Sequence, residues 1–177
     1  MSNLDRFREA QDAPHAGFAV ALRELQAGRK TSHWIWYVFP QLAGLARSSS
    51  AVYYGLAGVE EAADYLRDRV LGDRLVTATA VVRTHLAHTK ARRVRLEELM
   101  GSHIDGLKLV SCMTLFQHVA KALYAVDPQP RFAVMAEHAE KVLAAAAADG
   151  YGRCAYTDEH LRRPGRILDQ HRGEAQE

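Results

Sequence analysis

Residues 106–123 read GLKLVSCMTLFQHVAKAL, and this stretch indicates the fold class. Its apolar side chains recur every three or four residues, so they would lie along one face of an α-helix. The residues of that face are Leu109, Cys112, Phe116, Val119, Ala120 and Leu123. A second long helix is expected over residues 131–148, because the segment is rich in strong helix formers. We find no hairpin signal, strand-like alternation or internal repeat, so we expect an all-α protein.

Shorter helices are expected before and after this pair. Apolar spacing and the positions of proline and glycine favour helices over residues 4–11, 14–27, 73–88 and 94–100, one starting near 59 and a last one after Thr157. Gly44 and the run Ser48-Ser49-Ser50 indicate a loop. The expected architecture is a single compact domain of about seven helices over residues 1–169, without a substantial sheet. Residues 170–177 are expected to form a frayed or disordered tail.

The composition is that of a soluble globular protein. Of 177 residues, 48% are hydrophobic and 25% are charged, which suffices for one core. Lys and Arg number 23 against 21 Asp and Glu, an excess of two that gives no overall electrostatic drive toward nucleic acid or an anionic membrane. The apolar runs are too short to cross a bilayer, and the N-terminus lacks a secretory signal. We therefore expect a cytoplasmic protein without a membrane part, in which Cys112 and Cys154 are free thiols.

Residues 30–41, KTSHWIWYVFPQ, carry both tryptophans of the chain and form the first candidate site. Ser32 as a helix N-cap and Pro40 as a terminator favour a buried helix here. In the functional interpretation, the face of Trp34 or Trp36 stacks on a flat ligand ring. In the alternative interpretation, the aromatic side chains are simply core.

Polar side chains stand at both ends of this aromatic block. Lys30 and His33 would meet an anionic group of the ligand, and His33 would also move a proton near neutral pH. Ser32 and Gln41 would complete the polar lining of the pocket. The alternative is structural: Ser32 caps a helix, His33 bonds a backbone carbonyl, and Gln41 satisfies the broken backbone at Pro40.

Residues 101–116, GSHIDGLKLVSCMTLF, form the second candidate site. Asp105, Lys108 and Cys112 share one side of the expected helix. Asp105 would act as a base or accept a ribose hydroxyl, and Lys108 would bind phosphate beside the helix N-terminus. In the alternative, Ser102 and Asp105 form a capping box, or Asp105 is itself the N-cap, and Lys108 is its intrahelical partner. Cys112 is interpreted as an inert apolar thiol.

Two further sequence patterns give little indication of function. His85 and His88 are three residues apart, but no third ligand stands at a suitable distance, so we expect no metal site. We also find no cofactor-binding motif. The basic residues of 90–95 lack interleaved aromatic side chains that would stack on bases, so we interpret them as a solvated linker and do not expect nucleic-acid binding.

The two candidate stretches and several other positions form a recognisable set: Phe7, Ala10-Gln11, the Ala21-Leu22 to Gly28 helix, Lys30, residues 32–41, Gly44-Leu45, Tyr54, Leu71-Gly72, Arg74-Leu75 and residues 101–116. In these the chain resembles the domain-of-unknown-function family DUF1810 over nearly its whole length. The resemblance implies a compact helical domain found in bacterial and fungal proteins, without an established reaction, substrate or cofactor. The chain departs from the family at Met100, where an aromatic is usual, and at His103 and Ile104, which replace a more polar pair. These departures predict an altered turn before Asp105.

Together these patterns predict a small-molecule pocket protein, with enzymatic activity left open, built where residues 30–41 meet the start of the Asp105 helix. The ligand would be nucleotide-like or phosphorylated: Lys30 and Lys108 would bind its charge, a tryptophan would stack on it, and His33 or Asp105 would transfer a proton. The alternative is a noncatalytic protein-interaction module whose aromatic segment is core and which exposes an apolar patch. The sequence leaves homo-oligomer formation open.

Overall fold

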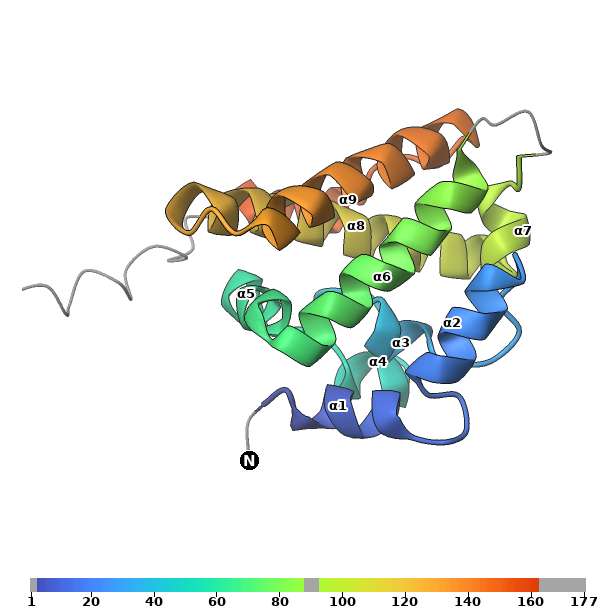
Figure 1. Ribbon diagram of the computed structural model, residues 1–177, viewed down its shortest axis with the longest axis horizontal. Coiled ribbons are helices and arrows are strands. Elements are labelled where there is room, and N and C mark those ends of the chain that lie inside the picture. The colour runs from blue at the N-terminus through green and yellow to red at the C-terminus, as the bar shows by residue number, and fades with distance from the viewer. Residues whose placement is uncertain (1–2, 88–92, 163–177) are drawn as a thin grey trace, which may run out of the picture.

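The computed structural model describes residues 3–87 and 93–162, and ten α-helices lie within them (Figure 1). Their bounds in chain order are α1 Asp5–Asp12, α2 Phe18–Gln26, α3 Ile35–Val38, α4 Ser49–Tyr53, α5 Val59–Arg67, α6 Arg69–Leu86, α7 Leu96–Met100, α8 His103–Val126, α9 Pro130–Ala148 and α10 Ala155–Arg162. Among the described residues, β-type pairing is limited to an isolated parallel bridge between Leu42 and Leu56. The expected all-α fold is confirmed.

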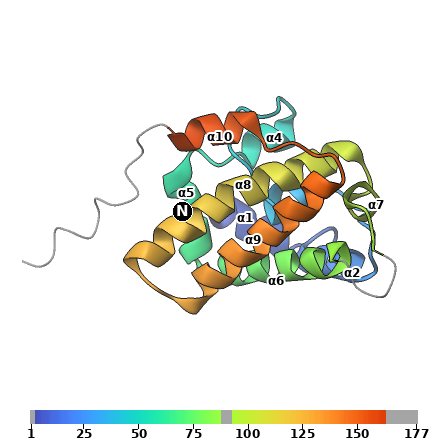
Figure 2. The same cartoon turned by 90° about the horizontal axis from the view of Figure 1, so that it is seen from above.

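Helix α8 is the centre of the fold, because other helices cover it on several sides. It packs along α9, contacts α5 and α7, and carries α10 on its outer side (Figure 2). Residues 109–116 are consequently all buried, including two hydroxyl side chains. The Thr114 hydroxyl donates to the carbonyl of Val110 at 2.8 Å, and the hydroxyls of Ser111 and Thr157 lie 3.1 Å apart. The buried surface of α8 is therefore wider than the single face that its apolar spacing indicates.

By length and composition alone, α8 is the one helix of the described residues that would be able to cross a membrane. In its most apolar window, 61% of the residues are buried inside the protein. A core helix of a soluble protein passes the same test, and the packing of α8 is of that kind.

The N-terminal helices form a layer against α6 and α8. Helix α1 contacts both α2 and α3, each of the three also contacts α6, and α3 reaches α8. The rings of Trp34 and Phe39 are fully buried here, with centroids 6.1 Å apart. The buried amide of Gln11 donates to the carbonyl of Tyr37 at 2.7 Å and to the hydroxyl of Tyr65 at 2.8 Å, which ties α1 to α3 and α5. Most of the aromatic segment is therefore core.

The aromatic segment and its neighbours differ locally from the expected helices. Helix α2 begins at Phe18 rather than at Pro14, because the chain first turns through Ala16, whose φ is 57°. Helix α3 is only four residues long, and Ser32 is not its N-cap. The hydroxyl of Ser32 binds Glu24 instead.

Two other helices begin at positions that differ from the expected ones. The loop expected at residues 48–50 is wrong, since α4 starts there and the Ser48 hydroxyl accepts the N–H of Ala51 at 3.2 Å. Helix α10 begins at Ala155, so Thr157 lies inside it rather than before it. The count of about seven helices was too low, because several helices are only one or two turns long. The expectations for residues 88–92, for the domain end at 169 and for the tail at 170–177 lie outside the described residues.

Candidate functional site

Glu24, on α2, fixes the loop that leads into α3. Its Oε2 accepts the backbone N–H of Thr31 at 2.8 Å, that of Ser32 at 2.9 Å and the indole N–H of Trp34 at 2.8 Å. Its Oε1 accepts the hydroxyl of Ser32. Burial alone would raise the pKa of Glu24, but these hydrogen bonds outweigh it and lower the pKa from 4.5 to about 2. An ionised carboxylate thus holds the loop in place.

Asp105, in the first turn of α8, binds two lysines. The ammonium of Lys30 lies 2.6 Å from its Oδ2, and that of Lys108 lies 2.9 Å from its Oδ1. We call Lys30, Asp105 and Lys108 the lysine cluster. Each ammonium also stands over a tryptophan ring, 5.3 Å from the centroid of Trp34 for Lys30 and 4.5 Å from that of Trp36 for Lys108. Cation–π attraction therefore helps to orient both lysines.

The lysine cluster carries an excess positive charge. Burial alone would raise the pKa of Asp105, but the hydrogen bonds and charges of Lys30 and Lys108 outweigh it and lower the pKa below its ordinary value. Asp105 is therefore ionised at neutral pH. Two ammonium groups and one carboxylate leave a formal charge of +1.

A left-handed glycine brings Lys30 to the start of α8. Gly101 follows α7 with φ of 78°, and the hydroxyl of Ser102 then accepts the N–H of Asp105 at 3.1 Å. This is half of the expected capping box, because the Asp105 carboxylate turns to the lysines. The N–H of Lys30 donates to the carbonyl of Leu99 at 2.8 Å, and a Cβ at position 101 would lie 2.7 Å from the carbonyl oxygen of Lys30. The two candidate stretches thus meet where only glycine fits.

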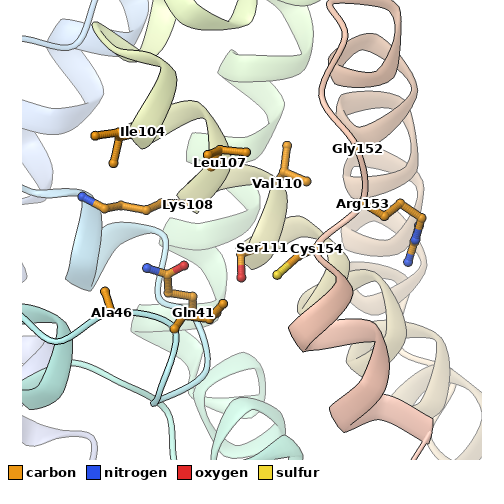
Figure 3. Close-up of a pocket in the computed structure, with 11 residues that line it drawn as sticks. Gln41, Ala46, Ile104, Leu107, Lys108, Val110, Ser111, Gly152, Arg153 and Cys154 are labelled. Atoms are coloured by element: carbon orange, nitrogen blue, oxygen red, sulfur yellow. The ribbon is translucent and has the colours of Figure 1, made fainter.

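Beside the lysine cluster lies a hollow of about 320 Å³ (Figure 3). Helix α8, residues 41–46 and the connection between α9 and α10 form its walls. Its apolar lining includes Leu45, Ile104, Leu107 and Val110. The polar lining includes Gln41, Lys108 and Ser111, whose side chains lie near one another in Figure 3.

The third wall of the hollow comes from residues 152–154. Arg153 lines the hollow, but its guanidinium points away from Lys108 and binds Asp158 through two bonds of 3.1 and 3.0 Å (Figure 3). The thiol of Cys154 accepts the hydroxyl of Thr157 at 3.2 Å. Both side chains are therefore held by α10. Among the described residues, no group of three or more His, Cys, Asp or Glu side chains is placed to hold a metal ion.

The structure brings five of the eight expected site residues together: Lys30, Trp36, Gln41, Asp105 and Lys108. Gln41 and Lys108 line the hollow. Lys30 and Asp105 stand behind Lys108, and Trp36 lies beneath its ammonium.

The other three expected site residues lie apart from the hollow. Ser32 and Trp34 bind Glu24, and the ring of Trp34 has no exposed surface on which a ligand would stack. His33 is exposed and is not part of the lining. Sequence reasoning did not identify Glu24 or the wall at 152–154, since no local motif surrounds them.

Comparison with known proteins places the chain in a family. The model of the family described as "Protein of unknown function (DUF1810)" matches residues 1–133. The crystal structure of the conserved hypothetical protein Rv1873 from Mycobacterium tuberculosis is similar, with 36% sequence identity and a TM-score of 0.69 over 89% of this chain and 94% of that chain. No curated protein matches the chain. The resemblance seen in the sequence is thus confirmed, and the chain belongs to the DUF1810 family.

Proposed function

We propose that the protein binds a small anionic molecule, nucleotide-like or phosphorylated, in the hollow beside the lysine cluster. The observation that carries this proposal is the position of Lys108. Its ammonium belongs to the lysine cluster, and its side chain also lines the hollow. A ligand seated there has a positive charge within reach.

The charge balance favours an anionic ligand. Lys30 alone neutralises Asp105 through a contact of 2.6 Å, so the charge of Lys108 is in excess. The side chain of Lys108 is only 17% exposed, which weakens solvent screening around it. An anion bound there would make a charge-assisted hydrogen bond, which is stronger than one between neutral groups.

The rest of the hollow suits a flat apolar body. Ile104 and Leu107 on α8 and Leu45 from the loop after α3 line it with apolar side chains. A volume of about 320 Å³ is near the lower end for ligand sites. We therefore expect a ligand of one ring system and one charged group, of mononucleotide size or smaller.

Proton transfer by His33 or Asp105 stays a prediction. A carboxylate whose pKa is lowered by two ammonium groups is a weak base, so we assign Asp105 the role of orienting Lys108. We accordingly propose binding and leave the reaction unnamed.

Isothermal titration calorimetry tests the proposal. Adenosine and uridine 5′-monophosphates, ribose 5-phosphate and inorganic phosphate would be titrated into the wild type, Lys108→Met and Lys121→Met. Loss of one charged hydrogen bond, about 1.5–3 kcal/mol, predicts binding weaker by roughly tenfold or more in Lys108→Met. Lys121 is exposed and lies outside the hollow, so its variant should bind as the wild type does. Equal affinities in Lys108→Met and the wild type, or no heat with any probe, would contradict the proposal.

The alternative, a noncatalytic interaction module, is favoured by one observation. Ile104 is 65% exposed and Leu107 is 45% exposed at the rim of the hollow, where a partner helix would find apolar surface. Absence of binding to every small-molecule probe would favour this alternative.

A further inference from the structure

Gln41 is a buried polar side chain whose hydrogen-bonding groups are unused within the described part of the chain. The residue is only 7% exposed, yet it lines the hollow. Its amide points toward α8, between Lys108 and Ser111 (Figure 3). Within residues 3–87 and 93–162, no group makes a hydrogen bond or an ion pair with this amide.

The backbone around Gln41 is fixed. The carbonyl of Gln41 accepts the N–H of Leu56 at 2.9 Å, and the N–H of Ala43 donates to the carbonyl of Leu56 at 2.8 Å. Leu42 between them is buried, and Pro40 restricts the chain on the other side. The amide is therefore presented from a rigid base at one place in the wall of the hollow.

A primary amide offers donors and an acceptor side by side. A phosphate or carboxylate has acceptors only, so it uses just half of such a group, and Lys108 is its better partner. A group that pairs with both the N–H and the oxygen of the amide is another planar edge, one with a donor and an acceptor side by side. Adenine presents such an edge to glutamine or asparagine in nucleic-acid recognition. A ligand that fills the hollow shields this amide from water, so a ligand that lacks the edge leaves the amide unpaired and is disfavoured.

We infer that the ligand of this hollow carries two recognition groups: an anion for Lys108 and a planar edge with an adjacent donor and acceptor for Gln41. Carboxamides, lactams and nucleobases have this edge. The inference rests on the proposed function, because it assigns the second half of the ligand to the same hollow.

Matched nucleotide pairs test this inference by calorimetry. Uridine 5′-monophosphate would be compared with its 3-methyl derivative, and adenosine 5′-monophosphate with its N6,N6-dimethyl derivative, since each methylated member lacks the donor of its edge. The unmodified member of at least one pair should bind the wild type about tenfold or more tightly than its blocked counterpart. In Gln41→Met, which keeps the length but not the hydrogen bonds, that preference should vanish. Gln26→Met, on the exposed end of α2, is the matched control and should keep it.

The outcomes separate the inference from the proposed function. If ribose 5-phosphate binds in a Lys108-dependent way and both members of each pair bind equally, the Gln41 inference is overturned while the anion site stands. If no probe binds the wild type, both are overturned. The wild-type comparison of blocked and unblocked probes needs no variant, so it decides the question even if Gln41→Met does not fold.

Discussion

Replacing Glu24 by glutamine should weaken the fold in a way that depends on pH. Glutamine has nearly the shape of glutamate, so its carbonyl oxygen would take the place of Oε2 and still accept the N–H groups of Thr31, Ser32 and Trp34. Its amide nitrogen would take the place of Oε1, and the hydroxyl of Ser32 would then accept a hydrogen bond instead of donating one. What is lost is the negative charge. Hydrogen bonds to a charged acceptor are roughly twice as strong as those between neutral groups.

The pKa of Glu24 sets the size of the expected loss in folding free energy. It falls from 4.5 to about 2, a drop of about 2.5 units. At about 1.4 kcal/mol per unit, this corresponds to at most about 3.5 kcal/mol of folding free energy. Water reaches part of the carboxylate and screens it, so we expect a loss of about 2 kcal/mol for Glu24→Gln at pH 7. Because the folded pKa is lowered, this contribution is complete above pH 4.5 and is lost as the pH falls toward 2.

Urea unfolding at pH 7 and at pH 3 measures this contribution. The free-energy difference between the wild type and Glu24→Gln should shrink by more than half between the two pH values. Glu9→Gln, at an exposed position of α1, is the control and should change stability by less than about 0.5 kcal/mol. A difference that is the same at both pH values would refute the electrostatic explanation. A loss below about 0.5 kcal/mol at pH 7 would show that the charge contributes little.

Two further substitutions test the packing around the site. Gly101→Ala should lower the free energy of unfolding in urea by about 1–3 kcal/mol, since φ is 78° and the new Cβ would meet the Lys30 carbonyl at 2.7 Å. Gly152→Ala is the control and should be nearly neutral, because a Cβ there would have nothing within 4 Å. A similar loss for both variants would argue against a steric cause. Asp149→Asn should lower the free energy of unfolding by about 2–4 kcal/mol, because the side chain of Asp149 is only 3% exposed and its carboxylate binds Arg93 at 2.7 Å and the N–H of Leu96 at 2.8 Å. An unchanged denaturation midpoint would show that the ion pair with Arg93 is dispensable.

The long helices were predictable because their signals are local. The apolar spacing of residues 106–123 and the composition of residues 131–148 indicated α8 and α9. Helix α8 extends three residues beyond the expected range at each end, and α9 begins one residue earlier than expected. Short elements were harder, since a neighbour decides them. Ser32 had the character of an N-cap, but Glu24 on another helix takes its hydroxyl. Ser48 lay in an apparent loop, yet its hydroxyl caps α4.

The candidate site was predictable only where a dense motif marked it. Lys30, Asp105 and Lys108 stood out in their motifs, and the structure joins them through Gly101. The wall at residues 152–154 could not be foreseen, because its contact with α8 bridges a long separation in sequence and no local motif surrounds it. This wall also lies beyond residues 1–133, the part matched by the family model.

The two tryptophans of the chain have a consequence for spectroscopy. They are the only two indoles in the sequence, and each lies beneath an ammonium group of the lysine cluster. The ring of Trp36 is 4.5 Å from the ammonium of Lys108, so an anion that draws this charge away changes the electric field at the indole. Trp34 is fully buried and its indole N–H is bonded to Glu24, so its fluorescence should change little when a ligand binds. Intrinsic fluorescence of the unlabelled protein should therefore report on occupancy of the hollow.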